Sequence, residues 1–520
     1  MAIQDLNVWR NPVFLASSVF VFILAVIGVV MPNSFGLAAN LLYEITTVDF
    51  GWFYLMTVFL IVVFLVGLAI SKYGSIRLAE EGEKPEYSFF TWIGMLFSAG
   101  FGVGLVFWGV AEPMSHFFAP PFENVEPQTD TAARLAMGYA FFHWGISQWA
   151  VFALVGLVIG FLQFRKKKSG LVSTALEPVL GKKSFVKHTV DSLAVIATVM
   201  GIATSLGLGV LQMSGGLHAV FQVGHSAGFQ WLIVVLVFAA YMISTMTGLD
   251  KGIRYLSNFN LLFALGLLVF VFIAGPTVFI LESFTLALGD YLSNFIQYSL
   301  RMQPYAGGTW VRDWTIFYWA WTIAWSPYVG AFVARVSKGR TIREYLLGVM
   351  AVPPLIACIW IAVFGGTAVW HDLNRGAGIA AAVDQDVTSA LFHTFEQLPF
   401  SMLLSVISIF LILTFLVTSA DSATYILASM SAKGRLTPPL IGKIVWGVLM
   451  AAIAAALLYS GGLDALQTAS LVSALPFTAI LLLMLLALAK VLRKEPLPIR
   501  KADVRRFKRL REATESEQRK

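Results

Sequence analysis

The segment "DWTIFYWAWTIAWSPY" (residues 313–328) carries seven large aromatic side chains in sixteen positions. Tryptophan in a membrane protein commonly lies at the boundary between lipid and water, and this explains Trp314 near the start of the segment. Trp321 and Trp325 lie too deep in the apolar run for one boundary. Helical spacing places both on one side with Tyr328. The segment therefore predicts a membrane helix with one aromatic face.

The composition of the whole chain supports a membrane protein. The 520 residues are 58% hydrophobic and 12% charged, with a mean hydropathy of +0.78, which leaves too little polar surface for a soluble protein. Apolar runs of about 20 residues cross the roughly 30 Å hydrocarbon core as helices. Twelve such runs are predicted: 12–32, 51–71, 89–112, 136–163, 189–213, 229–248, 257–282, 313–335, 344–369, 398–430, 441–460 and 465–490. The first is expected to be retained and not cleaved as a signal peptide.

The basic residues predict the orientation. With a cytoplasmic N-terminus, the loops on that side hold all of the 36 Lys and Arg except Arg134, Arg301, Arg312 and Arg375. This asymmetry follows the positive-inside rule. We expect a multi-pass protein of the cell inner membrane or plasma membrane with both termini cytoplasmic. The net charge of +7 then reflects topology and lipid contact, and no nucleic-acid partner is expected.

The twelve runs divide into sets with no soluble domain between them. Five helices are expected in each of two sets, and because five is odd the second set enters the membrane from the opposite side. Such inverted repeats are common in secondary transporters. The predicted divisions are a cytoplasmic N-terminus with two peripheral helices (1–88), a first repeat (89–282), an external amphipathic helix (283–312), a second repeat (313–490) and a basic cytoplasmic tail (491–520).

Glycines interrupt the third predicted span, "SAGFGVGLVFWG" (98–109), at Gly100, Gly102 and Gly104. Small residues let membrane helices pack closely, which is one interpretation. The other is a discontinuous helix, whose free backbone N–H and C=O groups meet an anion and a cation. Such backbone is tolerated at membrane depth only where it lines a cavity.

Polar groups stand inside the tenth span at "TSADSAT" (418–424). The hydroxyls of Thr418 and Ser419 are neutral oxygens of the kind that suit Na⁺, although such hydroxyls often bond back to their own helix. The carboxylate of Asp421 within an apolar helix is costly. It is therefore either functional or paired in a structural role.

The fourth span supplies further aromatics in "FHWGISQWAVF" (142–152), namely Trp144, Trp149 and Phe152. Together with the aromatic face of 313–335 they could enclose a quaternary ammonium group, each ring contributing about 0.5–2 kcal/mol by cation–π attraction. Aromatic core packing is the alternative. His143 has no second metal-type residue near it in the sequence and is expected to be a structural, hydrogen-bonded histidine. The chain has no P-loop, zinc-protease motif or nucleophile elbow, so we expect no enzyme.

Several of these stretches, in the same order, resemble the betaine/choline/carnitine transporter family (BCCT). They are "SAGFGVGLVFWGVAEP" (98–113), "GIATSLGLGVLQ" (201–212), "DWTIFYWAW" (313–321) continuing into "SPYVGAFVARVSKGRT" (326–341), and "TSADSAT". The resemblance covers nearly the whole membrane region. It implies an all-α membrane protein of twelve transmembrane helices with two inverted five-helix repeats, the LeuT-like fold, assembled as a homotrimer.

The resemblance also implies a site. The positions that match the family's substrate-binding residues are Trp144, Trp149, Phe152 and Thr322, with Trp321, Trp325 and Tyr328 along the pathway and Gly100, Gly102 and Gly104 facing the anionic end of the solute. The family's sodium site matches the carbonyls of Ser98, Phe101 and Phe415 and the hydroxyls of Thr418 and Ser419. No cofactor is implied, only Na⁺ as coupling ion.

The expected function is sodium-coupled import, by alternating access, of a small quaternary ammonium or zwitterionic compatible solute such as glycine betaine, choline, carnitine or dimethylsulfoniopropionate. Thr322 departs from the family's "WAWW" pattern, which raises the alternative of a non-quaternary osmolyte such as ectoine. The competing hypotheses are a sodium-independent exchanger, a proton-coupled choline importer and a solute sensor or channel.

Overall fold

The computed structural model describes residues 8–80, 82–100, 102–224, 226–247, 250–305 and 307–497. Within these ranges the chain is helical and forms no strand, which confirms the all-α expectation. The helices are α1 (Pro12–Val30), α2 (Pro32–Glu44), α3 (Gly51–Ile70), α4 (Phe89–Gly100), α5 (Val103–Phe118), α6 (Asp130–Trp144), α7 (Ile146–Gly160), α8 (Val172–Leu180), α9 (Ser184–Phe221), α10 (Ala227–Thr247), α11 (Asp250–Ala274), α12 (Thr277–Ser293), α13 (Phe295–Ser299), α14 (Phe317–Val336), α15 (Ile342–Arg375), α16 (Ile379–Gln385), α17 (Ala390–Glu396), α18 (Ser401–Met430) and α19 (Leu440–Leu492). Of the expected tail 491–520, residues 498–520 lie outside the described part.

Nine helices in the described residues are long and apolar enough to cross a membrane, or ten when the bent pair α4 and α5 counts as one span. Two features separate this number from the twelve expected spans. Gly462 has φ +59°, a left-handed value that favours glycine, and it breaks α19 into two pieces. The aromatic helix α14 is not among the nine, since its Trp, Tyr, Ser and Pro residues lower its mean hydropathy.

Two helix ends lie at positions that hydropathy alone did not predict. The expected span 257–282 is interrupted, because α11 ends at Ala274 and Pro276 precedes the start of α12. A ring nitrogen without a hydrogen cannot continue the hydrogen-bond ladder of a helix. The external helix expected near 288–302 is the end of α12 plus the short α13, with Asn294 between them.

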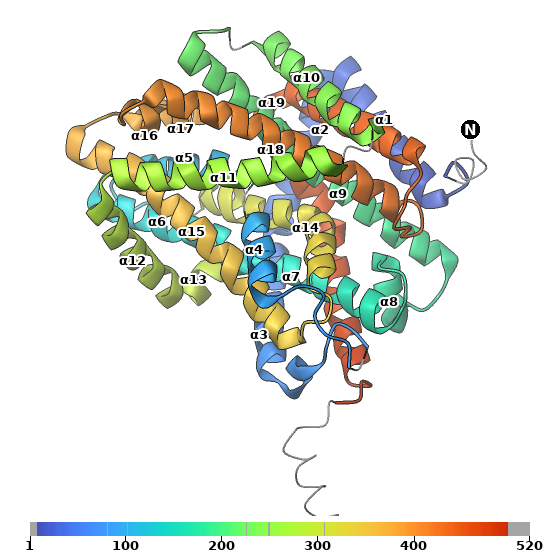
Figure 1. Ribbon diagram of the computed structural model, residues 1–520. Coiled ribbons are helices and arrows are strands. Elements are labelled where there is room, and N and C mark those ends of the chain that lie inside the picture. The colour runs from blue at the N-terminus through green and yellow to red at the C-terminus, as the bar shows by residue number, and fades with distance from the viewer. Residues whose placement is uncertain are drawn as a thin grey trace, which may run out of the picture.

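Long helices form the centre of the molecule (Figure 1). Helix α9 packs along α19, and α14 packs along α7. The α7–α14 contact is close because two glycines face each other: a Cβ on Gly330 would lie 2.9 Å from the backbone nitrogen of Gly156. This close approach brings the aromatic residues of α7 and α14 next to one another.

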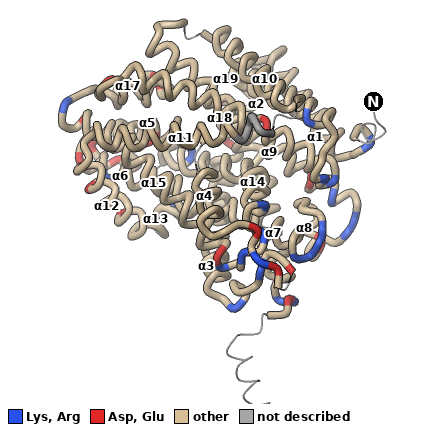
Figure 2. Tube along the Cα trace, in the orientation of Figure 1, with Lys and Arg blue, Asp and Glu red and all other residues tan. Residues whose placement is uncertain are grey.

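Charged residues gather at one end of the molecule, around α8 and the loops beside α3 and α7, and are sparser by α12 and α17 (Figure 2). At the charged end two connecting loops pair with each other. The N–H of Leu78 donates to the carbonyl of Arg340 at 2.8 Å, and the N–H of Ile342 donates to that of Ile76 at 2.8 Å. The connection before α4 is thus joined to the connection after α14.

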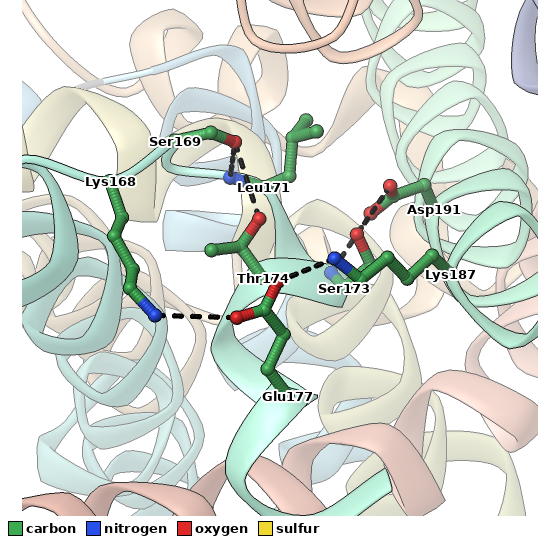
Figure 3. A network of polar contacts seen from close by, with 8 residues as sticks. All are labelled: Lys168, Ser169, Leu171, Ser173, Thr174, Glu177, Lys187 and Asp191. Atoms are coloured by element: carbon green, nitrogen blue, oxygen red, sulfur yellow. Dashed lines mark hydrogen bonds and ion pairs between the residues drawn. The ribbon is translucent and has the colours of Figure 1, made fainter. Parts of the chain in front are cut away.

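The short helix α8 is fixed at the same end by a polar network (Figure 3). The backbone N–H and hydroxyl of Ser173 both donate to the carboxylate of Asp191 in α9, at 2.9 and 2.6 Å. Glu177 forms ion pairs with Lys187 and Lys168. The hydrogen bond from Lys187, joined by that from Lys168, stabilises the carboxylate and so holds the pKa of Glu177 below its usual value. The network holds the chain from 168 to 180 against α9.

Candidate functional site

A cavity of about 870 Å³ lies between the central helices. One end is lined by the junction of α4 and α5 and by the aromatic residues of α6, α7 and α14. The other end reaches the charged end of the molecule, where Arg335, Gly434 and Lys443 line it. Of the ten residues predicted to bind substrate, nine line this cavity: Gly100, Gly102, Gly104, Trp144, Trp149, Phe152, Trp321, Trp325 and Tyr328.

The glycine-rich segment is a break between two helices. Helix α4 ends at Gly100 and α5 begins at Val103, with their axes at 59°. A Cβ at position 104 would lie 2.4 Å from the ring of Trp321 and 3.3 Å from that of Trp144. Gly104 therefore leaves room for two indoles, so both interpretations of this stretch, discontinuity and close packing, apply to it.

Five aromatic side chains form a continuous series of ring contacts, which we call the aromatic cluster: Trp144, Trp321, Trp325, Phe152 and Trp149. Successive ring centroids are 6.1, 6.3, 6.1 and 5.3 Å apart. Three of the four contacts are edge-to-face, an arrangement that favours attraction between rings. All five rings line the cavity, so they form a π-rich surface that a cation could contact.

Thr322 is placed differently. It is buried and does not line the cavity, and its hydroxyl has no hydrogen-bond partner in the described structure. On α14 it is rotated about 100° from Trp321, away from the face that Trp321 and Trp325 share. Its role in substrate choice stays a prediction.

Four of the five residues predicted to hold sodium line the same cavity: Ser98 on α4 and Phe415, Thr418 and Ser419 on α18. Phe101 lies outside the described residues. The hydroxyl of Thr418 donates to the carbonyls of Thr414 and Phe415 at 2.9 and 3.2 Å, the bonding back to the helix that is usual for threonine. A hydroxyl that donates in this way keeps its oxygen lone pairs available to a cation.

Asp421 lines the cavity next to these residues and has a polar partner on another helix. The hydroxyl of Thr245 in α10 donates to its carboxylate at 2.5 Å. The structural role that the sequence left open, contact with a neighbouring helix, is therefore present.

Glu112 of α5 is the centre of a buried network that the sequence did not single out. Its Oε1 meets Nδ1 of His143 at 2.6 Å and Nε2 of His116 at 3.3 Å. Its Oε2 accepts the indole N–H of Trp144 at 2.9 Å and the hydroxyl of Tyr318 at 2.5 Å. Glu112, His116 and His143 are fully buried. We call these five residues the Glu112 network.

The sequence places no second metal-type residue near His143, but the fold brings Glu112 and His116 next to it. With Glu112 and His116 it forms the one group in the described residues whose three ligand-type atoms lie within 4.8 Å of one another. The carboxylate has about four lone-pair positions, and four groups already occupy them. The carboxylate is satisfied by hydrogen bonds alone, while Nδ1 of His116 has no partner in the described structure, and we interpret the network as a support for Trp144. One signal in the sequence could have revealed this network: a carboxylate, Glu112, within an apolar span and four residues before a histidine, His116.

Comparison with known proteins identifies the family. The sequence model of the BCCT betaine/carnitine/choline family of transporters matches residues 12–497. The chain belongs to this family. It is thus a multi-pass membrane transporter and not an enzyme, as the sequence predicted.

Curated relatives of this transporter cover nearly its full length. It is 64% identical to an ectoine/hydroxyectoine transporter of Virgibacillus pantothenticus over 93% of this chain and 97% of the relative. It is 43% identical to a glycine betaine transporter of Bacillus subtilis over 94% and 96% of the two chains. A glycine betaine/proline/choline/ectoine transporter of Vibrio parahaemolyticus is 37% identical over 94% and 88%.

Proposed function

We propose that this transporter imports ectoine-type and betaine-type compatible solutes by sodium-coupled symport, with ectoine and hydroxyectoine as preferred substrates. The aromatic cluster on the cavity carries this proposal, because it offers π faces to the delocalised or quaternary cation that these zwitterions share. The 64% identity to an ectoine/hydroxyectoine transporter supports the preference. Choline, carnitine and dimethylsulfoniopropionate are weaker candidates.

Transport by alternating access is supported by the shape of the cavity. It extends from the aromatic cluster to Arg335 and Lys443 at the charged end, which the positive-inside rule assigns to the cytoplasm. At its other end the carboxylate of Glu112, behind the ring of Trp144, is fully buried. In the proposed cycle the described conformation is therefore the one that releases solute inward.

The proposed architecture is twelve membrane helices in the LeuT-like fold, with cytoplasmic termini and a homotrimeric assembly. Ten candidate spans in the described residues meet the length and hydropathy criteria. Counting the two pieces of α19 on either side of Gly462 separately gives an eleventh, and the aromatic helix α14 gives a twelfth. Broken helices near a midplane site, such as α4–α5, are typical of transporters with inverted repeats.

The proposal is tested by uptake of labelled ectoine and glycine betaine into proteoliposomes under an inward Na⁺ gradient, a K⁺ gradient or a proton gradient. We expect accumulation above the external concentration only with Na⁺. Uptake indifferent to Na⁺ would favour the exchanger, and uptake driven by protons would favour the proton-coupled importer. Equilibration without accumulation would indicate a channel, and binding without uptake a sensor.

The sodium site has a matched pair of variants on one helix. Thr418→Val removes a cavity hydroxyl and should raise the Na⁺ concentration needed for half-maximal uptake. Thr414→Val removes a buried hydroxyl, one turn earlier, that does not line the cavity and should leave this concentration unchanged. Equal effects of the two variants would contradict the placement of sodium.

A further inference from the structure

Gln148 is a buried polar residue of the cavity that the family comparison does not assign. It lies in the first turn of α7, is 5% exposed and lines the cavity. Its side-chain oxygen Oε1 has no hydrogen-bond partner in the described structure. Buried amide oxygens are nearly always hydrogen-bonded in proteins, so an unpaired one in a cavity points to a donor on a ligand.

The backbone presents Gln148 to the cavity through a break between α6 and α7. Gly145 has the unusual ψ of −148°, and the N–H that follows it, on Ile146, donates to the hydroxyl of Tyr291 in α12 at 2.9 Å. Gln148 is one helical turn before Phe152, and both side chains line the cavity. The unpaired oxygen therefore lies on the same helix face as a member of the aromatic cluster.

A second buried glutamine provides a comparison from outside the cavity. Gln212 of α9 is also buried with an unpaired Oε1, but its amide N–H donates to the carbonyl of Val106 at 3.1 Å and it does not line the cavity. It links two helices, whereas Gln148 has its oxygen free on the surface that a solute would contact.

An amide oxygen accepts hydrogen bonds, so a solute that satisfies Gln148 Oε1 must carry a hydrogen-bond donor. A cation held against the aromatic cluster presents its own atoms to Gln148. The trimethylammonium group of glycine betaine has only methyl groups and no N–H donor. The cyclic amidinium of ectoine carries two N–H groups, which donate strongly because the group is charged.

We propose that Gln148 Oε1 accepts a hydrogen bond from an N–H of the solute's cationic group, and so selects N–H-bearing cyclic amidinium zwitterions over quaternary ammonium zwitterions. This inference rests on the proposed function, since it assigns the substrate preference to one atom of the same site. A site built to accept a hydrogen bond discriminates against a ligand without the donor, because the buried oxygen is then left unpaired.

The test compares dissociation constants for ectoine and glycine betaine by tryptophan fluorescence titration of purified full-length protein. Gln148→Met keeps the side-chain length and removes the acceptor. We expect the Kd for ectoine to rise about tenfold or more, the order expected for a charge-assisted hydrogen bond, and the Kd for glycine betaine to change little. Gln212→Met, the matched control, should leave the ratio of the two constants unchanged.

A second measurement needs no variant. An ectoine analogue with both ring nitrogens methylated keeps the amidinium charge and lacks N–H donors, so the wild type should bind it at least several-fold more weakly than ectoine. Equal binding of analogue and ectoine would overturn the inference, as would an equal loss of both solutes in Gln148→Met. In both cases the proposed transport function would stand. If the wild type bound neither ectoine nor glycine betaine, the proposed function would fall, and this inference with it.

Discussion

Glu112 shows how one carboxylate can be held in an apolar membrane protein and put to use. An unpaired charge at this depth would be very costly, and the four surrounding groups offset that cost. One of the four is the indole N–H of Trp144, whose ring lines the cavity. The carboxylate thus fixes the ring plane of Trp144, and by accepting its N–H it raises the electron density of the face that would meet a cation.

We predict that Glu112→Gln weakens solute binding about tenfold, because an amide offers one acceptor oxygen where four groups need acceptors. Trp144→Phe, which removes the N–H and keeps an aromatic ring, should cause a similar loss. Since Glu112 acts through Trp144, the double variant should bind no worse than Trp144→Phe alone. Fluorescence or calorimetric titrations of the three proteins measure this, and additive losses would show that Glu112 acts independently.

At the residue level, nine of the ten predicted substrate positions line one cavity, and their contact with a solute stays a prediction. Helical spacing accounts for the shared face of Trp321, Trp325 and Tyr328, whereas the assignment of the other six cavity-lining positions to the substrate came from the family resemblance. Glu112 and Gln148 were missed, since their significance depends on partners that are distant in sequence or absent. Phe101 lies outside the described residues, so its position in the sodium site is untested.

Among the elements, the broken helix α4–α5 is the one whose geometry most directly limits the site. Gly104 is surrounded by indole rings, whereas a Cβ added to Gly94 in α4 would meet no atom within 4 Å. The two glycines therefore form a natural comparison of the same substitution in crowded and open surroundings.

We predict that Gly104→Ala raises the Kd for solute severalfold, because the added methyl forces Trp321 and Trp144 out of the aromatic cluster. Gly94→Ala should leave the affinity unchanged and support the helix slightly, since alanine is the better helix former. Thermal unfolding in detergent, with and without solute, checks both variants. Wild-type affinity in Gly104→Ala would show that the indoles can shift without cost.

The helices themselves were largely predictable, and their interruptions were not. Apolar runs located the spans because lipid admits little else. The break at Gly145 is stabilised by the hydroxyl of Tyr291, from a helix far along the chain, and no local pattern reveals that bond. The break of α19 at Gly462 likewise depends on the backbone conformation of one residue, whereas the low hydropathy of α14 follows from its composition.

For the whole molecule, polar bonds across helices form two groups in the walls of the cavity, and the bonds of Gln212 to Val106 and of the Trp321 indole to Ser205 join one group to the other. The Glu112 network joins α5, α6 and α14. On the other side Thr204 of α9 bonds to Leu466 and Ser470 of α19, and the hydroxyl of Tyr241 in α10 bonds to Gly447 of α19. Thr245 of α10 adds the bond to Asp421 of α18.

The consequence of the Glu112 network is mechanical. Separating its members in the apolar interior would strand a charge, whereas the two bonds between the groups join uncharged partners. The least costly motion therefore breaks those two bonds and carries α5, α6 and α14 together past α9, α10, α18 and α19. Spin-label pairs read by electron paramagnetic resonance would then report constant spacing within each group and altered spacing between them when Na⁺ and solute are added. Changing distances between α5 and α6 would contradict this. A carboxylate that supports one tryptophan would also decide which helices travel as a single rigid body.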